Sequence, residues 1–319
     1  IAEAGGITPV VVALTRHCDN SSVCEAACVA LWNLAVHDPN QVSIAAAGGI
    51  EPVVAALARH GDDSSVCEAA CGALGILGGH AANKVSIAEA GGIAAVVAAL
   101  TRHGDDSGVC QAACGVLRNL ALNATNQVSI AKAGGVAPVV AALSRHGGHS
   151  GVCRAACGAL RNLAVHAANK VSIAEARGIE PVVVALSRHG DDSIVCKAAC
   201  GALWNLAAYA ANKVSIAEAG GIVPMVAALS RHGGNSGVFK VICGALQNLA
   251  LDTTNQVSIA EAGSIAPVVA ALTRHGDDSG VCQAACGVLR NLALDTTNQV
   301  SIAEAGGIAP VVAALTRHG

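Results

Sequence analysis

The chain has 319 residues and a formal net charge of −3 at pH 7, and only 1% of its residues are aromatic. A charge this small supplies no broad positive field, which argues against nucleic acid and anionic lipid as partners. The longest apolar run, Ile93 to Leu100, is far shorter than the roughly 20 residues of a membrane-spanning helix, so membrane insertion is not expected.

One unit is repeated along the chain with a period of 43 residues and no insertion. A constant period of this length is typical of solenoids, in which each unit packs only on its neighbours. We therefore expect a single solenoid over residues 1–319. It opens within a first helix and closes after a second helix, so we expect a piece of a longer array. The marker Gly-Gly-Ile, or a close variant, begins at Gly5, Gly48, Gly91, Gly134, Arg177, Gly220, Gly263 and Gly306.

Each unit divides into three predicted helices separated by glycine, and the fourth unit shows the pattern clearly. A short first helix is expected over 126–133 and is stopped by Gly134. The second helix begins near Pro138, where a missing N–H costs nothing, and ends at Arg145, where a cation meets the negative end of the helix dipole. The third helix, 150–165, is the longest.

The third helix of each unit carries a continuous apolar stripe, which we expect to form the core. Its opposite side, with Arg154, Gly158 and Arg161, is expected to face outward. The stripe follows the helical spacing i, i+3, i+4, i+7, and in the fourth unit it consists of Val152, Ala155, Ala156, Ala159, Leu160, Leu163 and Ala164.

Two units depart from this pattern. The second unit has four glycines between Gly72 and Gly79, and each should loosen its third helix by about 1 kcal/mol relative to alanine. We expect that helix to be the least stable of its kind. The sixth unit replaces a cysteine with Phe239 and an alanine with Val241, which enlarges its core locally.

The unit reads Asn-x-x-x-Ile-x-x-Ala-Gly-Gly-Ile-x-Pro-Val-Val-x-x-Leu, then Ala-x-x-x-Leu-x-Asn-Leu-Ala, and it resembles the armadillo repeat over the whole chain. The resemblance implies an all-α, right-handed superhelical solenoid of about seven and a half three-helix repeats. It also implies a concave groove, lined by third helices, that binds extended protein segments. The importin-alpha branch clamps lysines of nuclear localisation signals with a Trp one turn before the Asn. That position argues here against import cargo, because it holds Val29, Gly72, Gly115, Gly158, Gly201, Gly244 and Gly287.

Six of the seven predicted third helices carry an asparagine near their end, and these residues form a ladder along the predicted groove. Each amide is able to hold the backbone of an extended peptide, or instead to bridge neighbouring helices. Trp32 and Trp204 directly precede two of these asparagines and are candidate anchors for a ligand, or fold against the helix of the next unit. The ladder consists of Asn33, Asn119, Asn162, Asn205, Asn248 and Asn291, while Ile76 takes its place in the second unit.

Charge changes sign along the same face. Glu25 and Glu68 stand near its start, whereas later units carry cations. A run of cations favours an acidic or phosphorylated segment held by units three to seven, and a solvated face without a ligand is the alternative. The predicted cations are Arg118, Arg154, Arg161, Lys197, Lys240 and Arg290.

Cysteines and histidines recur in every complete unit but predict no reactive centre. Pairs such as Cys153 and Cys157, spaced i, i+4 on a helix, suit neither a disulfide nor a four-ligand zinc site, so we expect core thiols. The histidines, from His17 to His318, are expected to cap helix ends. With no phosphate loop, paired-carboxylate cleft or cofactor fingerprint, we predict no catalytic residue, no metal site and no cofactor. Regular free cysteines favour a reducing compartment, cytoplasm or nucleus.

These observations predict a non-enzymatic protein-interaction scaffold whose groove binds an extended, acidic protein segment. The alternative is a structural strut that joins neighbouring subunits of a larger assembly through its ends and convex surface. Near-identical copies are also typical of an engineered array, but irregular positions such as Gly75, Arg177 and Phe239 argue against that origin.

Overall fold

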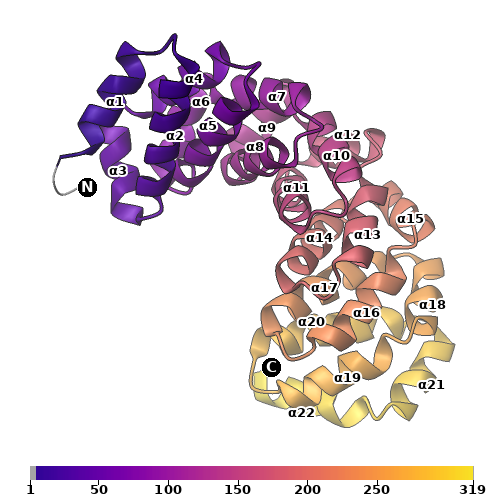
Figure 1. Ribbon diagram of the computed structural model, residues 1–319. Helices are drawn as coiled ribbons and strands as arrows, with labels where there is room; N and C mark the ends of the chain where they lie inside the picture. Colours follow the sequence, from indigo (N-terminus) through magenta and orange to yellow (C-terminus); the bar gives the residue numbers. More distant parts are fainter. Residues whose placement is uncertain (1–4, 319) are drawn as a thin grey trace. The chain divides into compact units, whose positions relative to one another are not determined.

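The computed structural model describes residues 5–318, and every regular element within them is a helix (Figure 1). The predicted all-α class is confirmed. Each 43-residue unit folds as three helices in the predicted order. The short first helices are α3 (Asp38–Ala46), α6 (Ala81–Glu89), α9 (Ala124–Lys132), α12 (Ala167–Glu175), α15 (Ala210–Glu218), α18 (Thr253–Glu261) and α21 (Thr296–Glu304).

The second and third helices alternate with these short helices along the chain. The second helices are α1 (Ile7–Arg16), α4 (Ile50–Arg59), α7 (Gly92–Arg102), α10 (Val136–Arg145), α13 (Ile179–Arg188), α16 (Ile222–His232), α19 (Ile265–Arg274) and α22 (Ile308–His318). The third helices are α2 (Ser21–Ala35), α5 (Ser64–Leu77), α8 (Ser107–Leu120), α11 (Ser150–Leu163), α14 (Ser193–Leu206), α17 (Ser236–Leu249) and α20 (Ser279–Leu292).

The chain forms two compact units, Ile1–Ala176 and Arg177–Gly319, which we call the N-terminal and C-terminal units. In the N-terminal unit α2, α5, α8 and α11 pack side by side in this order, and in the C-terminal unit α14, α17 and α20 do the same (Figure 1). Within each unit the third helices therefore share one face. A single uninterrupted solenoid over 1–319 stays a prediction, and the expected opening within a first helix falls on residues 1–4, outside the described part.

A sharp bend joins the first helix of each repeat to the second, and it explains the recurring glycine. Between α9 and α10 the bend is 80°, and Gly134 adopts a left-handed φ of 74° there. Glycine takes this conformation without strain because it has no Cβ. Arg177 occupies the equivalent position with a φ of 58°, and it is the one non-glycine residue with a positive φ in the described chain.

The third helices begin at polar N-caps and bury the predicted stripe. The Asp106 carboxylate, for example, accepts the backbone N–H of Gly108 and of Val109, at 2.8 and 3.1 Å. In α11 the whole stripe from Val152 to Ala164 is buried, and so are Cys153 and Cys157. The core is therefore made of small aliphatic residues and thiols, with Phe239 fully buried as its one large aromatic.

The glycine-rich third helix of the second repeat is a complete helix. It ends at Leu77, and Gly78 is its C-cap, so only Gly72 and Gly75 lie inside it. The expectation that four glycines loosen this helix is therefore wrong for two of them.

No single helix in residues 5–318 is long and apolar enough to cross a membrane, although six pairs of helices joined by a sharp bend have the length and composition to do so.

Candidate functional site

The asparagine ladder joins neighbouring third helices. The Nδ2 of Asn119 donates to the carbonyl of Gly75 at 2.7 Å, and that of Asn162 donates to the carbonyl of Arg118 at 2.8 Å. In the C-terminal unit, Asn248 and Asn291 bond the carbonyls of Trp204 and Gln247 at 3.1 and 2.9 Å. The structure therefore shows the second of the two expected roles: each of these four amides bridges its third helix to the preceding third helix.

Exposure separates the members of the ladder. Asn162 and Asn291 are only 7% and 3% exposed, so their amides lie beneath the surface. Asn119, Asn205 and Asn248 are half-buried, and Asn33 is exposed. The prediction that the ladder holds a peptide thus rests on these four.

Both tryptophans fold over a glycine of the next third helix. A Cβ built on Gly72 would clash with the ring of Trp32, and one built on Gly244 would lie 2.6 Å from Cε2 of Trp204. Both tryptophans therefore pack on the third helix of the next repeat. Trp32 is nevertheless half-exposed, and Trp204 is 40% exposed. Packing on the next repeat was one of the two expected roles, but sequence reasoning missed the partner, which is the glycine 40 residues after each tryptophan.

Three arginines converge where α8 meets α11. The aliphatic stem of Arg118 crosses Gly158, whose added Cβ would lie 2.6 Å from its Cδ. Arg154 and Arg161 stand on either side of this glycine on α11. Burial lowers the pKa of the Arg118 guanidinium from its ordinary value, and the positive charges of Arg154 and Arg161 lower it further. We call Arg118, Arg154 and Arg161 the arginine cluster.

The arginines at the ends of second helices differ from this cluster because most of them pair with a carboxylate. Arg231 Nε lies 3.2 Å from Asp191 Oδ1, and Arg59, Arg102, Arg145 and Arg317 form equivalent pairs with Asp19, Asp62, Asp105 and Asp277. No such pair forms at Arg118 or Arg154 within residues 5–318. The cluster is consequently a concentration of positive charge, which suits an anion.

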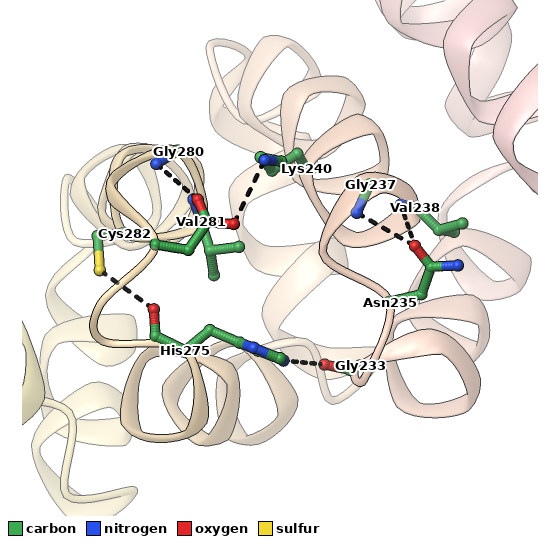
Figure 2. Close-up of polar contacts among 10 residues, drawn as sticks. Gly233, Asn235, Gly237, Val238, Lys240, His275, Gly280, Val281 and Cys282 are labelled. Atoms are coloured by element: carbon green, nitrogen blue, oxygen red, sulfur yellow. Dashed lines mark hydrogen bonds and ion pairs between the residues drawn. The ribbon is translucent and has the colours of Figure 1, made fainter.

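One predicted cation of the C-terminal unit has an internal partner, as Figure 2 shows. Lys240 Nζ lies 3.4 Å from Oδ2 of Asp278, whose other oxygen accepts the backbone N–H of Gly280 and of Val281 at the start of α20. These contacts lower the pKa of Asp278, with the Val281 N–H as the largest cause. Of the other predicted cations, Lys197 and Arg290 are exposed on α14 and α20.

The histidines also bond across repeats rather than within their own helix. His275 ends α19, and its Nε2 lies 2.8 Å from the carbonyl of Gly233, which ends α16 (Figure 2). His103 makes the same contact with Gly61 at 2.8 Å. His275 therefore has the expected capping role, and the helix end that it caps belongs to the preceding repeat.

The cysteines lie in the core and not at a site. All 14 are free thiols, and only Cys18 and Cys286 are not buried. Residues 5–318 hold no group of three or more histidine, cysteine, aspartate or glutamate side chains arranged to bind a metal.

Two clefts open on the third-helix faces, one in each unit. That of the C-terminal unit, about 970 Å³, lies between α20 and α22 and is lined by apolar side chains including Ile308, Val312 and Leu315, each more than half exposed. That of the N-terminal unit, about 190 Å³, is lined by Gly75, Gly115 and the arginines Arg118 and Arg154, among others. Sequence reasoning predicted a groove on the third-helix faces but did not single out the smaller cleft.

Comparison with known proteins agrees with this architecture. A family model described as LRRK2 ARM repeat matches residues 7–133 and 174–318, and one described as Armadillo/beta-catenin-like repeat matches residues 123–165. The chain belongs to the armadillo repeat family. No curated protein matches it.

Several solved structures share the fold. One engineered protein is 28% identical, with a TM-score of 0.74 over 99% of this chain and 89% of that chain. A structure reported for a phosphorylation switch that controls the interaction between cadherin and beta-catenin is 21% identical, with a TM-score of 0.78 over 94% of this chain and 55% of that one. A computationally designed armadillo repeat protein for modular peptide recognition is 24% identical, with a TM-score of 0.61 over 76% and 99%. At these two lower identities the likeness concerns the fold alone.

Proposed function

We propose that the chain is a non-enzymatic interaction scaffold whose third-helix faces bind an extended, acidic segment of a partner protein. The arginine cluster is the observation that carries this proposal. Arg118 is half-buried beside two further arginines, and the described residues place no carboxylate in an ion pair with it. A carboxylate or phosphate of a ligand would relieve that repulsion and form charge-assisted hydrogen bonds.

The comparisons support a binding role of this general kind. The solved neighbours include an armadillo protein designed for peptide recognition and a structure from work on cadherin and beta-catenin. The partner proposed here is recognised by charge, and neither nucleic acid nor a membrane is part of the proposal. We further propose the cytoplasm or nucleus as its location, which the 14 free thiols support because a reducing compartment preserves them.

Charge reversal tests the proposal. The variant combining Arg154→Glu, Arg161→Glu and Lys197→Glu is compared with a control combining Lys84→Glu, Lys132→Glu and Lys213→Glu on first helices. Both change the net charge equally. Fluorescence anisotropy with a labelled peptide of alternating glutamate and serine should show at least about tenfold weaker binding for the first variant and little change for the control. Equal effects in the two variants, or no binding by the wild type, would refute the proposal.

A second candidate function is a structural part of a larger assembly. The apolar cleft between α20 and α22 favours it, because Ile308, Val312 and Leu315 would be buried by contact with a second copy. Sedimentation velocity tests this candidate. Concentration-dependent association that Leu315→Glu abolishes supports it, and a monomer at all concentrations argues against it.

A further inference from the structure

Neighbouring third helices follow one packing rule, in which a long side chain from one helix lies over a glycine of the next. Trp32 covers Gly72 and Arg118 covers Gly158 in the N-terminal unit. Gln247 covers Gly287 in the C-terminal unit, where an added Cβ would lie 2.7 Å from its Oε1. Because glycine has no side chain, the covering residue can lie flat against the next helix.

The junction between α5 and α8 is the exception. The covering position there holds Gly75, so nothing lies over Gly115, and an added Cβ at Gly115 would have no atom within 4 Å. The missing side chain leaves the cleft of about 190 Å³ described above. We call this space the Gly75 cleft. It is of the size that holds a ring, since a buried cavity of about 150 Å³ binds benzene.

The walls of the Gly75 cleft are chemically unequal. Trp32 of α2 lines it, and so does Glu68 of α5, whose carboxylate lies against Gly108 at the start of α8. Arg118 and Arg154 of the arginine cluster also line it. The cleft therefore offers an aromatic neighbour and an open helix surface beside a concentration of positive charge.

We propose that the Gly75 cleft anchors an aromatic side chain of the acidic segment, with a neighbouring carboxylate of that segment on Arg118 and Arg154. This inference rests on the proposed function, and it adds which acidic segments bind: those with an aromatic residue beside the carboxylate. An aromatic ring fits because it fills the space a covering side chain occupies at the other junctions, and because ring faces stack on tryptophan and arginine. The acidic residues lie toward Arg118, near the end of α8, and Arg154 of α11, since the Glu68 carboxylate at the start of α8 repels them.

Filling the cleft from within provides the test. In Gly75→Trp the new ring can lie over Gly115 as Trp32 lies over Gly72, and its Cβ would meet Val116 Cγ2 at an ordinary 3.7 Å. The variant should therefore fold, which its thermal unfolding checks. Gly75→Gln, which copies Gln247, gives a second and smaller filling. The matched control is Gln247→Trp, which places tryptophan at the same repeat position where a covering residue is already present.

Two acidic peptides of equal length and charge serve as probes, one with a central phenylalanine and one with alanine there. Wild type and Gln247→Trp should prefer the phenylalanine peptide by about tenfold. Gly75→Trp should lose that preference but bind the alanine peptide as wild type does. Equal wild-type binding of the two peptides, or a preference that survives both Gly75 variants, overturns the inference alone. Failure of both peptides to bind overturns the proposed function as well.

Discussion

The Asn162 amide donates a hydrogen bond of 2.8 Å to the backbone carbonyl of Arg118, and so joins α11 to α8 beneath the arginine cluster. The same amide accepts the Nε–H of Arg161 at 3.3 Å. The observed structural bonding and the proposed ligand binding thus involve adjacent residues on one face. Substitutions there must be judged for stability before they are judged for binding.

The asparagine ladder allows these two roles to be separated. We expect Asn162→Ala to lower the free energy of unfolding by about 1–3 kcal/mol, because it leaves the part-buried carbonyl of Arg118 without its donor. Asn33→Ala, at an exposed position, should change it by less than about 0.5 kcal/mol. Urea unfolding measures both. Equal losses at the two positions would show that bonding between helices does not distinguish them.

Two glycines of α5 should respond to alanine with opposite signs. Gly75→Ala should stabilise the protein by about 0.5–1 kcal/mol, because the methyl group meets nothing closer than 3.7 Å and the helix gains propensity. Gly72→Ala should cost about 1–3 kcal/mol, because the methyl group overlaps the ring of Trp32. Adding Trp32→Ala to Gly72→Ala should recover part of that loss. Stabilisation by both substitutions would contradict the packing rule.

The left-handed backbone at Arg177 predicts a reciprocal exchange. Gly134→Arg should destabilise by about 1 kcal/mol, since a residue with a Cβ is strained at a φ of 74°. Arg177→Gly should be neutral or stabilising by a few tenths of a kcal/mol, because relief of strain offsets the greater freedom of glycine in the unfolded chain. Differential scanning calorimetry of the two variants checks the pair. A large loss of stability for Arg177→Gly would mean that the arginine side chain, and not the backbone, matters there.

Buried thiols predict a loss of stability in alkali. Burial raises the pKa of Cys28 to about 12 and those of Cys67 and Cys110 to about 11, from an ordinary 9.0. Above pH 9 the unfolded chain releases these protons before the folded chain does, so stability is full below pH 9 and falls as the pH rises towards about 11 to 12. The urea midpoint should drop across this range, and less steeply in Cys28→Ala. A midpoint that stays level from pH 9 to 11 would argue against buried thiols.

Most of the fold could be predicted because local signals repeat. Gly134 and Pro138 end or begin helices by their own backbone preferences, and Arg145 suits a helix end by its charge. The predicted bounds fall within a few residues of those observed. The site could not be predicted to the same degree. The position of the Trp32 ring on Gly72 depends on how two helices align, and that alignment is set by packing between repeats. Sequence reasoning interpreted Gly72 only as the absence of the tryptophan that importin-alpha uses to bind lysine. It therefore missed Trp32 as the residue that covers this glycine.

Pairing across repeats explains a second difference. Lys240 was predicted as one more groove cation, but it pairs with Asp278, the N-cap of α20. Asp278 also accepts two backbone N–H groups at the start of α20, and sequence reasoning singled out neither these bonds nor its contact with Lys240. Lys240 therefore differs from Arg118 and Arg154, which form no ion pair within residues 5–318.

Photo-crosslinking tests the central claim, that the third-helix face carrying the arginine cluster binds an acidic segment. A peptide of alternating glutamate and serine with one benzophenone side chain is irradiated with the full chain, and the attached residues are located by mass spectrometry. We predict attachment on α5, α8 and α11 near Arg118 and Arg154, reduced by Arg154→Glu. Attachment confined to the first helices α9 and α12, and unaffected by that substitution, would contradict the account.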